Sequence, residues 1–209
     1  MKERKKMTRM AKRNQKLLAD VLVELLNEKE FGKVTISELS RRAGVSRTMF
    51  YNYYYDIYDL VEEVENDLID LHCIWWKRMI EQPQDVAQTL RERRETSRQL
   101  EDAYRHYKPI LDLNCGKADY YERLDRRLYG IVVSDTRLMS QFEDPVMARL
   151  TTHFVNSGAV SMVRDNVENN FPISFTDMAR IAMEGLQHYV EYRMPARRDD
   201  QPEEEPDQN

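Results

Sequence analysis

A cluster of tyrosines is the densest group of chemically useful side chains in the sequence. Five of them fall within the eight positions 51–58, shortly after the tetrapeptide GVSR. A tyrosine ring can pack in a core, stack on a base or line a ligand pocket, and its hydroxyl can donate to DNA from a reading helix. The cluster alone does not separate these four roles. Its members are Tyr51, Tyr53, Tyr54, Tyr55 and Tyr58.

Charge is unevenly distributed along the chain. Residues 1–55 contain 13 Lys and Arg against 6 Asp and Glu, a net charge of +7, and residues 1–16 alone contain 8 of the basic side chains and one Glu. The remaining residues contain 19 basic and 31 acidic side chains, a net charge of -12, which brings the chain to -5. A basic end joined to an acidic remainder indicates that one end meets a polyanion.

The sequence lacks the signatures of several protein classes. No apolar run approaches the roughly 20 residues that span a bilayer, and the basic start has no apolar signal-peptide core, so we expect a cytoplasmic protein without a membrane partner. Cys73 and Cys115 lack CxxC spacing, and the four histidines lack metal-ligand spacing, so we expect no metal and no cofactor. GxSxG, P-loop and GxGxxG motifs do not occur, so we expect no enzymatic activity.

Helical rather than alternating periodicity runs through nearly the whole sequence. Leu18, Val21, Leu22 and Leu25, for example, form one apolar stripe at helical spacing. We therefore predict an all-α fold of about nine helices. Besides two short helices considered next, helices are expected over residues 8–28, 57–79, 83–107, 118–139, 144–168 and 175–193.

Residues 35–53 carry the capping signals of two short helices. Thr35 followed by Glu38 is a capping box, which satisfies free N–H groups at a helix start. Ala43-Gly44 is a helix-end signal, and Ser46 can cap a second helix. Two short helices across a tight glycine turn are the helix-turn-helix arrangement, which binds DNA.

The stretch VTISELSRRAGVSRTMFYNYYYDIYDLVEEV resembles the DNA-binding domain of the TetR family of bacterial transcriptional regulators. The resemblance covers residues 8–62 and rests on the capped helix, A-G-V-S, Phe50-Tyr51 and Leu60 in register with a preceding amphipathic helix. It implies a homodimer whose two helix-turn-helix domains enter successive major grooves of a palindromic operator. It also implies a larger C-terminal helical domain that dimerises and, in many members, binds an effector.

We accordingly expect three parts in the chain. Residues 1–55 form a basic arm and the helix-turn-helix DNA-binding domain, and residues 56–194 form the helical effector-binding and dimerisation domain. Residues 195–209 contain no apolar side chain and are expected to form a disordered acidic tail.

The resemblance assigns DNA contacts position by position. Arg47, Thr48 and Met49 occupy the positions that approach bases, where Arg47 would make a bidentate contact to guanine and Met49 an apolar contact to a thymine methyl. Tyr54 is instead expected in the core, with Phe50. The full set of predicted DNA-binding residues is Thr35, Ser37, Ser46, Arg47, Thr48, Met49, Tyr51, Asn52 and Tyr53.

Two positions depart from the family pattern. Tyr55 and Ile57 stand where family members often carry lysines, one of which clamps a phosphate at the start of the next helix. Each lost phosphate contact weakens non-specific DNA affinity and lowers its salt dependence by about one unit of slope. We expect the basic amino-terminal arm to compensate by reaching along the backbone or into the minor groove.

The C-terminal part holds two less specific sets of candidates. Aromatic side chains can line an effector pocket, although at helical spacing they serve equally as core. Small and apolar residues in the last two helices are candidates for the dimer interface, with packing inside the chain as the alternative. The effector candidates are Trp75, Trp76, Tyr104, Tyr107, Tyr121 and Phe154, and the dimer candidates are Gly158, Val160, Ile181, Gly185, Leu186 and Tyr189.

The sequence thus predicts a homodimeric regulator of transcription whose partner is double-stranded DNA. The first hypothesis is a repressor released by a small-molecule effector that changes the separation of the two DNA-binding domains. The alternative is a regulator or activator controlled by a protein partner.

Overall fold

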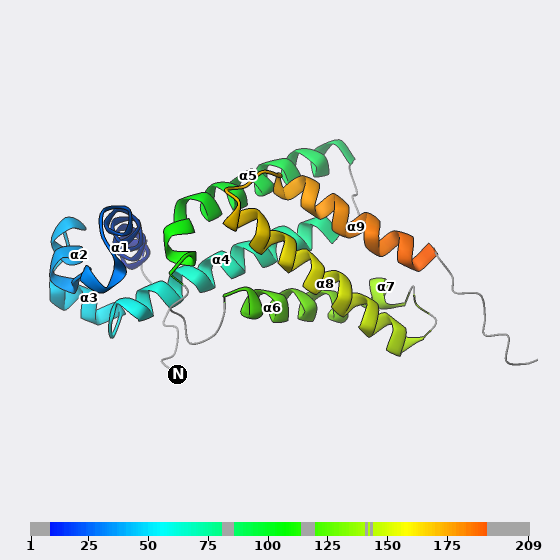
Figure 1. The fold of residues 1–209 in the computed structure, drawn as a ribbon, viewed down its shortest axis with the longest axis horizontal. Helices are drawn as coiled ribbons and strands as arrows, with labels where there is room; N and C mark the ends of the chain where they lie inside the picture. The colour runs from blue at the N-terminus through cyan, green and yellow to red at the C-terminus, as the bar shows by residue number, and fades with distance from the viewer. Residues whose placement is uncertain (1–8, 81–85, 114–119, 141, 143, 192–209) are drawn as a thin grey trace, which may run out of the picture.

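The computed structural model describes residues 9–80, 86–113, 120–140, 142 and 144–191 (Figure 1). Over these ranges the chain folds into helices and connecting turns without a strand, which confirms the predicted all-α class. The helices are α1 (Arg9–Glu28), a 3-10 turn η1 (Phe31–Lys33), α2 (Ile36–Arg42), α3 (Arg47–Tyr53), α4 (Ile57–Ile80), α5 (Val86–Leu111), α6 (Tyr120–Ser134), α7 (Thr136–Met139), α8 (Pro145–Glu168) and α9 (Phe175–Glu191).

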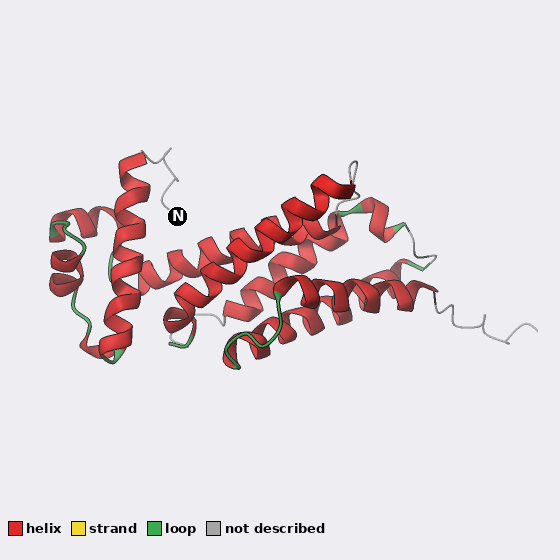
Figure 2. Cartoon of the chain, turned by 90° about the horizontal axis from the view of Figure 1, so that it is seen from above, coloured by secondary structure: helices red, strands yellow, loops and turns green. Residues whose placement is uncertain are grey.

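The helices form two groups that α4 connects. Helices α1, α2 and α3 lie together at one end of the molecule, and α4 begins beside them and runs away from them (Figure 1). Helices α5 and α6 pack along the rest of α4, while α8 packs on α6 and α9 packs on α5, and the view from above shows the same division (Figure 2). We call α1 to α3 with the first turn of α4 the head, and the remaining helices the body.

Local sequence signals set several of the helix boundaries. The Asp144 carboxylate accepts the backbone N–H of Val146 at 2.7 Å, and Pro145 occupies the first turn of α8, where its missing N–H costs nothing. At the other end of α8, Asn170 and Phe171 adopt φ angles of 60° and 62°, which turn the chain toward α9. The predicted helix over residues 144–168 is therefore confirmed at both ends.

Two predicted boundaries were wrong. We expected the helix after residue 83 to end near Tyr107, before the turn former Pro109, but α5 continues through Pro109 to Leu111. Ile110, which is fully buried, anchors this last turn in the core. The helix expected over residues 118–139 is interrupted at Asp135, whose side chain accepts two backbone N–H groups and so starts the short helix α7.

Some sequence features lie outside the described residues. These are the first eight residues of the basic arm, Cys115 and the acidic tail at residues 195–209. No helix in the described ranges is long and apolar enough to cross a membrane.

Candidate nucleic-acid interface

Two side-chain caps and one glycine shape the helix-turn-helix unit. Thr35 Oγ1 accepts the backbone N–H of Glu38 at 3.2 Å, and Ser46 Oγ accepts that of Met49 at 3.1 Å. Between the helices, Gly44 has a φ of 66°, a left-handed conformation in which a side chain would be strained. The N–H of Val45 then reaches the Ser40 carbonyl at 3.0 Å, which closes the C-terminus of α2. The angle between α2 and α3 is thereby fixed.

The inner face of α3 is anchored in the core of the head. Phe50 is fully buried and Tyr54 is 3% exposed, as predicted, and they pack against Leu39 of α2 and against the apolar stripe of α1. Burying a side chain of this size stabilises a fold by about 1.5–3 kcal/mol. Because the inner face is fixed in this way, the outer face of α3 is presented to solvent in a single orientation.

The outer face carries most of the predicted DNA-binding side chains. All but two of the nine are exposed, namely Thr35, Ser37, Ser46, Arg47, Thr48, Tyr51 and Asn52. The remaining two, Met49 and Tyr53, are half-buried, and the Tyr53 hydroxyl lies 3.6 Å from the Met49 sulfur. The structure therefore brings the predicted set together on one surface, formed by α3 and the start of α2.

Several cations near this surface are already paired with carboxylates. Arg42 donates to Glu28 at 2.6 Å, and Lys29 donates to Glu38 at 2.8 Å. Hydrogen bonds from these partners lower the pKa values of Glu28 and Glu38, so both carboxylates stay ionised. Arg47, in contrast, makes no ion pair with the part of the chain that the structure describes. Its guanidinium is therefore available to a base or a phosphate.

Arg41 is a candidate that the sequence interpretation missed. It is exposed and lies four residues after Ser37, so the two share one face of α2. Helical spacing from Ser37 was the signal that would have found it. An arginine at this position can hold a phosphate while α3 meets base edges.

The start of α4 is acidic where DNA-binding relatives are expected to be basic. The carboxylate of Asp59 accepts the N–H of Tyr55 at 2.8 Å, and that of Asp56 accepts the N–H of Asp59 at 2.9 Å. Two carboxylates therefore occupy a helix N-terminus that would otherwise attract a phosphate. Tyr55 is 84% exposed, whereas Tyr58 packs edge-on against Phe31 with the ring centroids 5.1 Å apart.

The predicted effector residues occupy both buried and exposed positions in the described part of the structure. Trp75, Trp76 and Tyr104 are 0–6% exposed, and a space of only about 10 Å³ remains beside the two tryptophans, about the minimum that can hold one water molecule. Tyr121 is half-buried and carries the Arg164 guanidinium over its ring at 4.6 Å, while Phe154 is 76% exposed on α8.

Trp75 and Tyr104 of this aromatic cluster have hydrogen-bond partners inside the core, whereas the buried indole N–H of Trp76 has none among the described residues. The Trp75 indole donates to Ser97 at 2.7 Å, and Tyr104 lies 2.9 Å from His72 Nδ1 and 2.5 Å from the Tyr120 hydroxyl. Burial lowers the pKa of His72 to about 3, so its ring is neutral. The cluster is a packed core with internal hydrogen bonds, which accounts for the lack of space between its rings.

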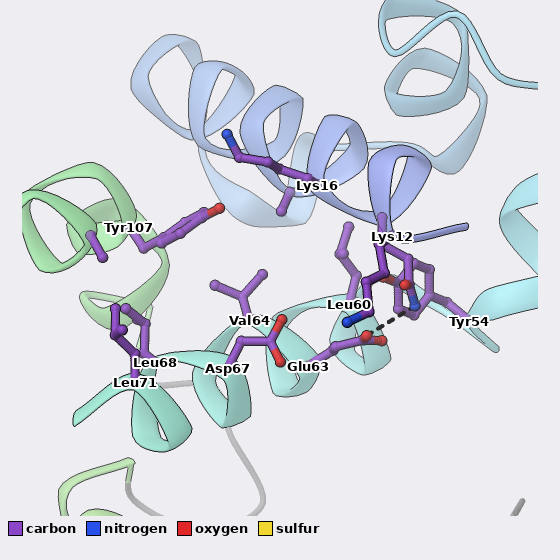
Figure 3. Close-up of a pocket in the computed structure, with 13 residues that line it drawn as sticks. Lys12, Lys16, Tyr54, Leu60, Glu63, Val64, Asp67, Leu68, Leu71 and Tyr107 are labelled. Atoms are coloured by element: carbon purple, nitrogen blue, oxygen red, sulfur yellow. Dashed lines mark hydrogen bonds between the residues drawn. The ribbon is translucent and has the colours of Figure 1, made fainter. Parts of the chain in front are cut away.

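A larger cavity lies where the head meets the body. It has a volume of about 330 Å³ and is lined by α1, α4 and α5 (Figure 3). Among the predicted effector residues it takes in only Tyr107. The other lining residues were not predicted, although Glu63 and Asp67 recur at helical spacing between the apolar residues Leu60, Val64 and Leu68.

The predicted dimer residues fall into three groups. Val160 is 5% exposed and belongs to the core of the body, whereas Gly158 and Ile181 are exposed on α8 and α9. Gly185, Leu186 and Tyr189 lie on α9, but their side chains are outside the described part of the structure. An apolar stripe that the sequence interpretation missed lies on the outer side of α8, where Val146 and Leu150 are 50% and 60% exposed in line with Phe154.

The geometry defines the class of protein as a helix-turn-helix DNA-binding protein, with an exposed reading helix on a small head and a helical body. Comparison with known proteins agrees. Residues 18–64 match the family model described as "Bacterial regulatory proteins, tetR family". The amino-terminal part of the chain is therefore a TetR-family DNA-binding domain, as the sequence predicted.

One solved structure extends the likeness to the body. The protein titled "Dihydroxyacetone kinase operon activator DhaS" aligns with a TM-score of 0.61 over 85% of this chain and 96% of its own, at 15% sequence identity. At that identity the likeness shows a shared fold and nothing about ligands. No curated protein sequence matches the chain. The described residues contain no group of His, Cys, Asp and Glu side chains able to hold a metal ion.

Proposed function

We propose that the chain is a transcriptional regulator that binds a palindromic operator as a homodimer, acting as a repressor that an effector releases. One observation carries the DNA-binding part of this proposal: α3 is fixed from within by Phe50 and its serine cap while Arg47, Thr48 and Tyr51 face solvent. A short helix held in this way fits the major groove of DNA.

Each side chain of the reading surface has a role that follows from its chemistry. Arg47 donates two hydrogen bonds to a guanine edge, which discriminates against other bases by about 1–3 kcal/mol. Tyr51 and Asn52 donate to phosphates or base edges on either side, and half-buried Met49 offers an apolar surface to a thymine methyl. Ser37 and Arg41 hold the backbone that crosses the start of α2.

The acidic start of α4 supports the proposal that the remaining phosphate contacts come from other parts of the chain. Asp56 and Asp59 repel a phosphate at this helix N-terminus, so the basic residues before α1 and exposed Arg13 are assigned to the DNA backbone. The operator affinity should therefore fall sharply when the residues before α1 are removed.

The apolar stripe on α8 supports the homodimer. Val146, Leu150 and Phe154 recur every four residues, so they lie along one side of the helix, and the exposed Gly158 continues the line. An exposed apolar surface of this kind marks an interface, and a second copy of the chain covers it symmetrically. Ile181, which is half-exposed, lies on α9, the helix that packs against α8.

A second candidate function is control by a protein partner, with activation in place of repression. The packed aromatic cluster supports it, because the space beside its tryptophans is too small for an effector. The structural neighbour is titled as an operon activator, so a protein of this fold can activate transcription.

The experiment that tests DNA binding is an electrophoretic mobility shift assay at low salt, with the DNA that lies upstream of the gene for this protein. We expect Arg47→Ala and Tyr51→Ala to weaken binding at least tenfold, which corresponds to about 1.4 kcal/mol. Arg98→Ala, which removes an exposed arginine of α5 in the body, is the matched control and should bind like the wild type. If the wild type binds no palindromic DNA, or if all three variants bind equally well, DNA reading by α3 is refuted.

The dimer is tested by sedimentation equilibrium. Phe154→Glu places a charge in the middle of the α8 stripe, and we expect it to convert the wild-type dimer to a monomer. Ile74→Glu changes an apolar side chain of α4 that is 50% exposed and serves as the control. If Phe154→Glu dimerises as well as the wild type, the α8 stripe is not the dimer interface.

A further inference from the structure

The cavity at the junction of head and body has an apolar wall contributed by three helices. On α4 the apolar residues recur at intervals of three and four, so they lie on one side of that helix. Helices α1 and α5 each add one alanine. The apolar lining residues are Ala19, Leu60, Val64, Leu68, Leu71 and Ala103. Covering apolar surface stabilises a complex, so this wall favours a ligand with an apolar body.

The two carboxylates of the lining, Glu63 and Asp67, already interact with other groups of the protein. Gln15 donates to Glu63 at 2.9 Å, and Figure 3 shows both carboxylates on α4. A ligand cation would have to compete with the existing partners while losing its own water. A ligand without charge leaves these interactions in place.

The two lysines of the lining, Lys12 and Lys16, are exposed residues of α1. The Lys16 ammonium lies 3.7 Å from the Asp20 carboxylate, and solvent reaches both lysines. An ion pair between exposed groups contributes little free energy, so a ligand anion would gain little from them. Since the lining favours neither sign of charge, it suits an uncharged ligand.

Tyr107 gives the cavity an aromatic ring and a hydrogen-bonding oxygen. The side chain extends from α5 toward α1 (Figure 3), and its hydroxyl donates to the Asp20 carboxylate at 3.4 Å. Burial, together with the Asp20 carboxylate, raises the pKa of Tyr107 to about 12, so the phenol stays neutral at physiological pH. Its oxygen can still accept a hydrogen bond from a ligand, and its ring can pair with another ring.

We propose that this cavity binds a small neutral aromatic alcohol, an arylalkanol in chemical class. Its ring lies against Leu68, Leu71 and Ala103, and its hydroxyl donates to the Tyr107 oxygen. A volume of about 330 Å³ is at the lower end of the range for small-molecule sites, which suits a ligand with one ring and a short chain.

The position of the site gives the ligand leverage over the head. Helix α1 contributes to the core of the head, and it also faces α4 and α5 across the cavity. Near the cavity, α1 is joined to α5 by a contact of 2.8 Å between the Asp20 carboxylate and His106. A ligand that contacts both walls therefore favours one separation of α1 from the body, and so one angle of the head. This regulatory consequence rests on the proposed function, whereas the binding itself does not.

Isothermal titration calorimetry on the full chain without DNA tests the binding. The probes are 2-phenylethanol, the cation phenethylammonium and the anion 3-phenylpropionate, which share the ring and differ in the charge of the end group. We expect one 2-phenylethanol to bind per chain with a Kd of about 1 mM or lower, an ordinary affinity for a ligand of this size. Both ions should bind at least tenfold more weakly. Equal affinity for the three probes, preference for either ion, or no saturable binding of the alcohol would overturn the proposal.

Variants that fill the cavity locate the site. Leu71→Trp enlarges a lining side chain on α4, and Ala103→Leu does the same on α5. Ile74→Trp makes the matched change on α4 at a position that is 50% exposed and does not line the cavity. We expect both filling variants to weaken 2-phenylethanol binding at least tenfold and Ile74→Trp to change it less than twofold. Wild-type affinity in Ala103→Leu, the milder change, together with a wild-type urea midpoint, would overturn the proposal.

The hydrogen bond to Tyr107 has a test of its own. The methyl ether of 2-phenylethanol keeps the ring but cannot donate, so we expect the wild type to bind it at least threefold more weakly than the alcohol. In Tyr107→Phe, which keeps the ring of the protein, the two probes should bind equally. A preference for the alcohol that persists in Tyr107→Phe would refute the role of this oxygen.

A mobility shift assay with saturating 2-phenylethanol separates this inference from the proposed function. Binding of the alcohol by a protein that binds no DNA would refute the proposed function and leave the site intact. Operator binding by a protein that does not bind the alcohol would refute the site and leave DNA binding intact. We expect a fivefold or larger change in operator affinity for the wild type, and none for Ala103→Leu.

Discussion

Mild acid should destabilise the body through one buried histidine. His72 is 1% exposed, and burial lowers its pKa from 6.5 to about 3. His72 binds a proton near pH 6.5 in the unfolded chain but not in the folded chain. The contribution of neutral His72 to the free energy of unfolding is therefore complete above pH 6.5 and is lost as the pH falls from 6.5 toward 3. Between about pH 7.5 and pH 5, this linkage lowers the free energy of unfolding by about 2 kcal/mol.

Urea unfolding at these two pH values, followed by the fluorescence of buried Trp75 and Trp76, measures the effect. His72→Asn replaces the imidazole with an amide that does not titrate but retains polar atoms near Tyr104. The other titrating groups are common to both proteins, so their contributions cancel in the comparison. We expect the wild type to lose about 2 kcal/mol more than the variant on acidification. Equal losses in both proteins would refute a neutral, buried His72.

Three further predictions concern local stability, each measured as the urea midpoint at neutral pH. Gly44→Ala should lower the free energy of unfolding by about 1–2 kcal/mol, because alanine does not easily adopt the φ of 66°, although its Cβ would meet open space. An unchanged midpoint would mean that the backbone of this turn relaxes. Ser46→Ala should lower the free energy of unfolding by about 1 kcal/mol and Ser46→Asn should lower it much less, because asparagine also caps helices. Equal losses of stability in the two variants would argue against the cap. Asn166→Ala should lower the free energy of unfolding by about 2–3 kcal/mol, because the buried Asn166 amide makes two hydrogen bonds to the backbone of Ile173. A loss of stability under about 0.5 kcal/mol would show that these hydrogen bonds do not stabilise the fold.

Features with a local cause were predictable from the sequence. The caps Thr35, Ser46 and Asp144 each need only a neighbouring N–H, and Gly44 needs only its own backbone angle, so residue type and spacing were enough. The buried face of Phe50 and Tyr54 followed from their separation of four residues. The exposed reading face then followed, since it is the opposite side of the same helix.

Features that depend on several helices at once were harder to predict. Pro109 lies inside α5 because tertiary burial of Ile110 outweighs the lost hydrogen bond, and proline alone suggested a turn. The aromatic residues Trp75, Trp76 and Tyr104 have the composition of a pocket, but only their mutual packing shows that they fill the space. The cavity beside Glu63 and Asp67 depends on the distance between α1, α4 and α5, which no single periodicity encodes.

The separation of anchoring from reading side chains in α3 bears on how the protein can change its target during evolution. The side chains of Arg47, Thr48 and Asn52 make no hydrogen bond or ion pair with the residues that the structure describes, whereas Phe50 and Ser46 hold the helix in place. Substitutions at the three outward positions therefore carry little cost to folding. A duplicated copy of this chain could acquire a new operator by drift at those positions alone, while the core of the head and its junction with the body are inherited unchanged.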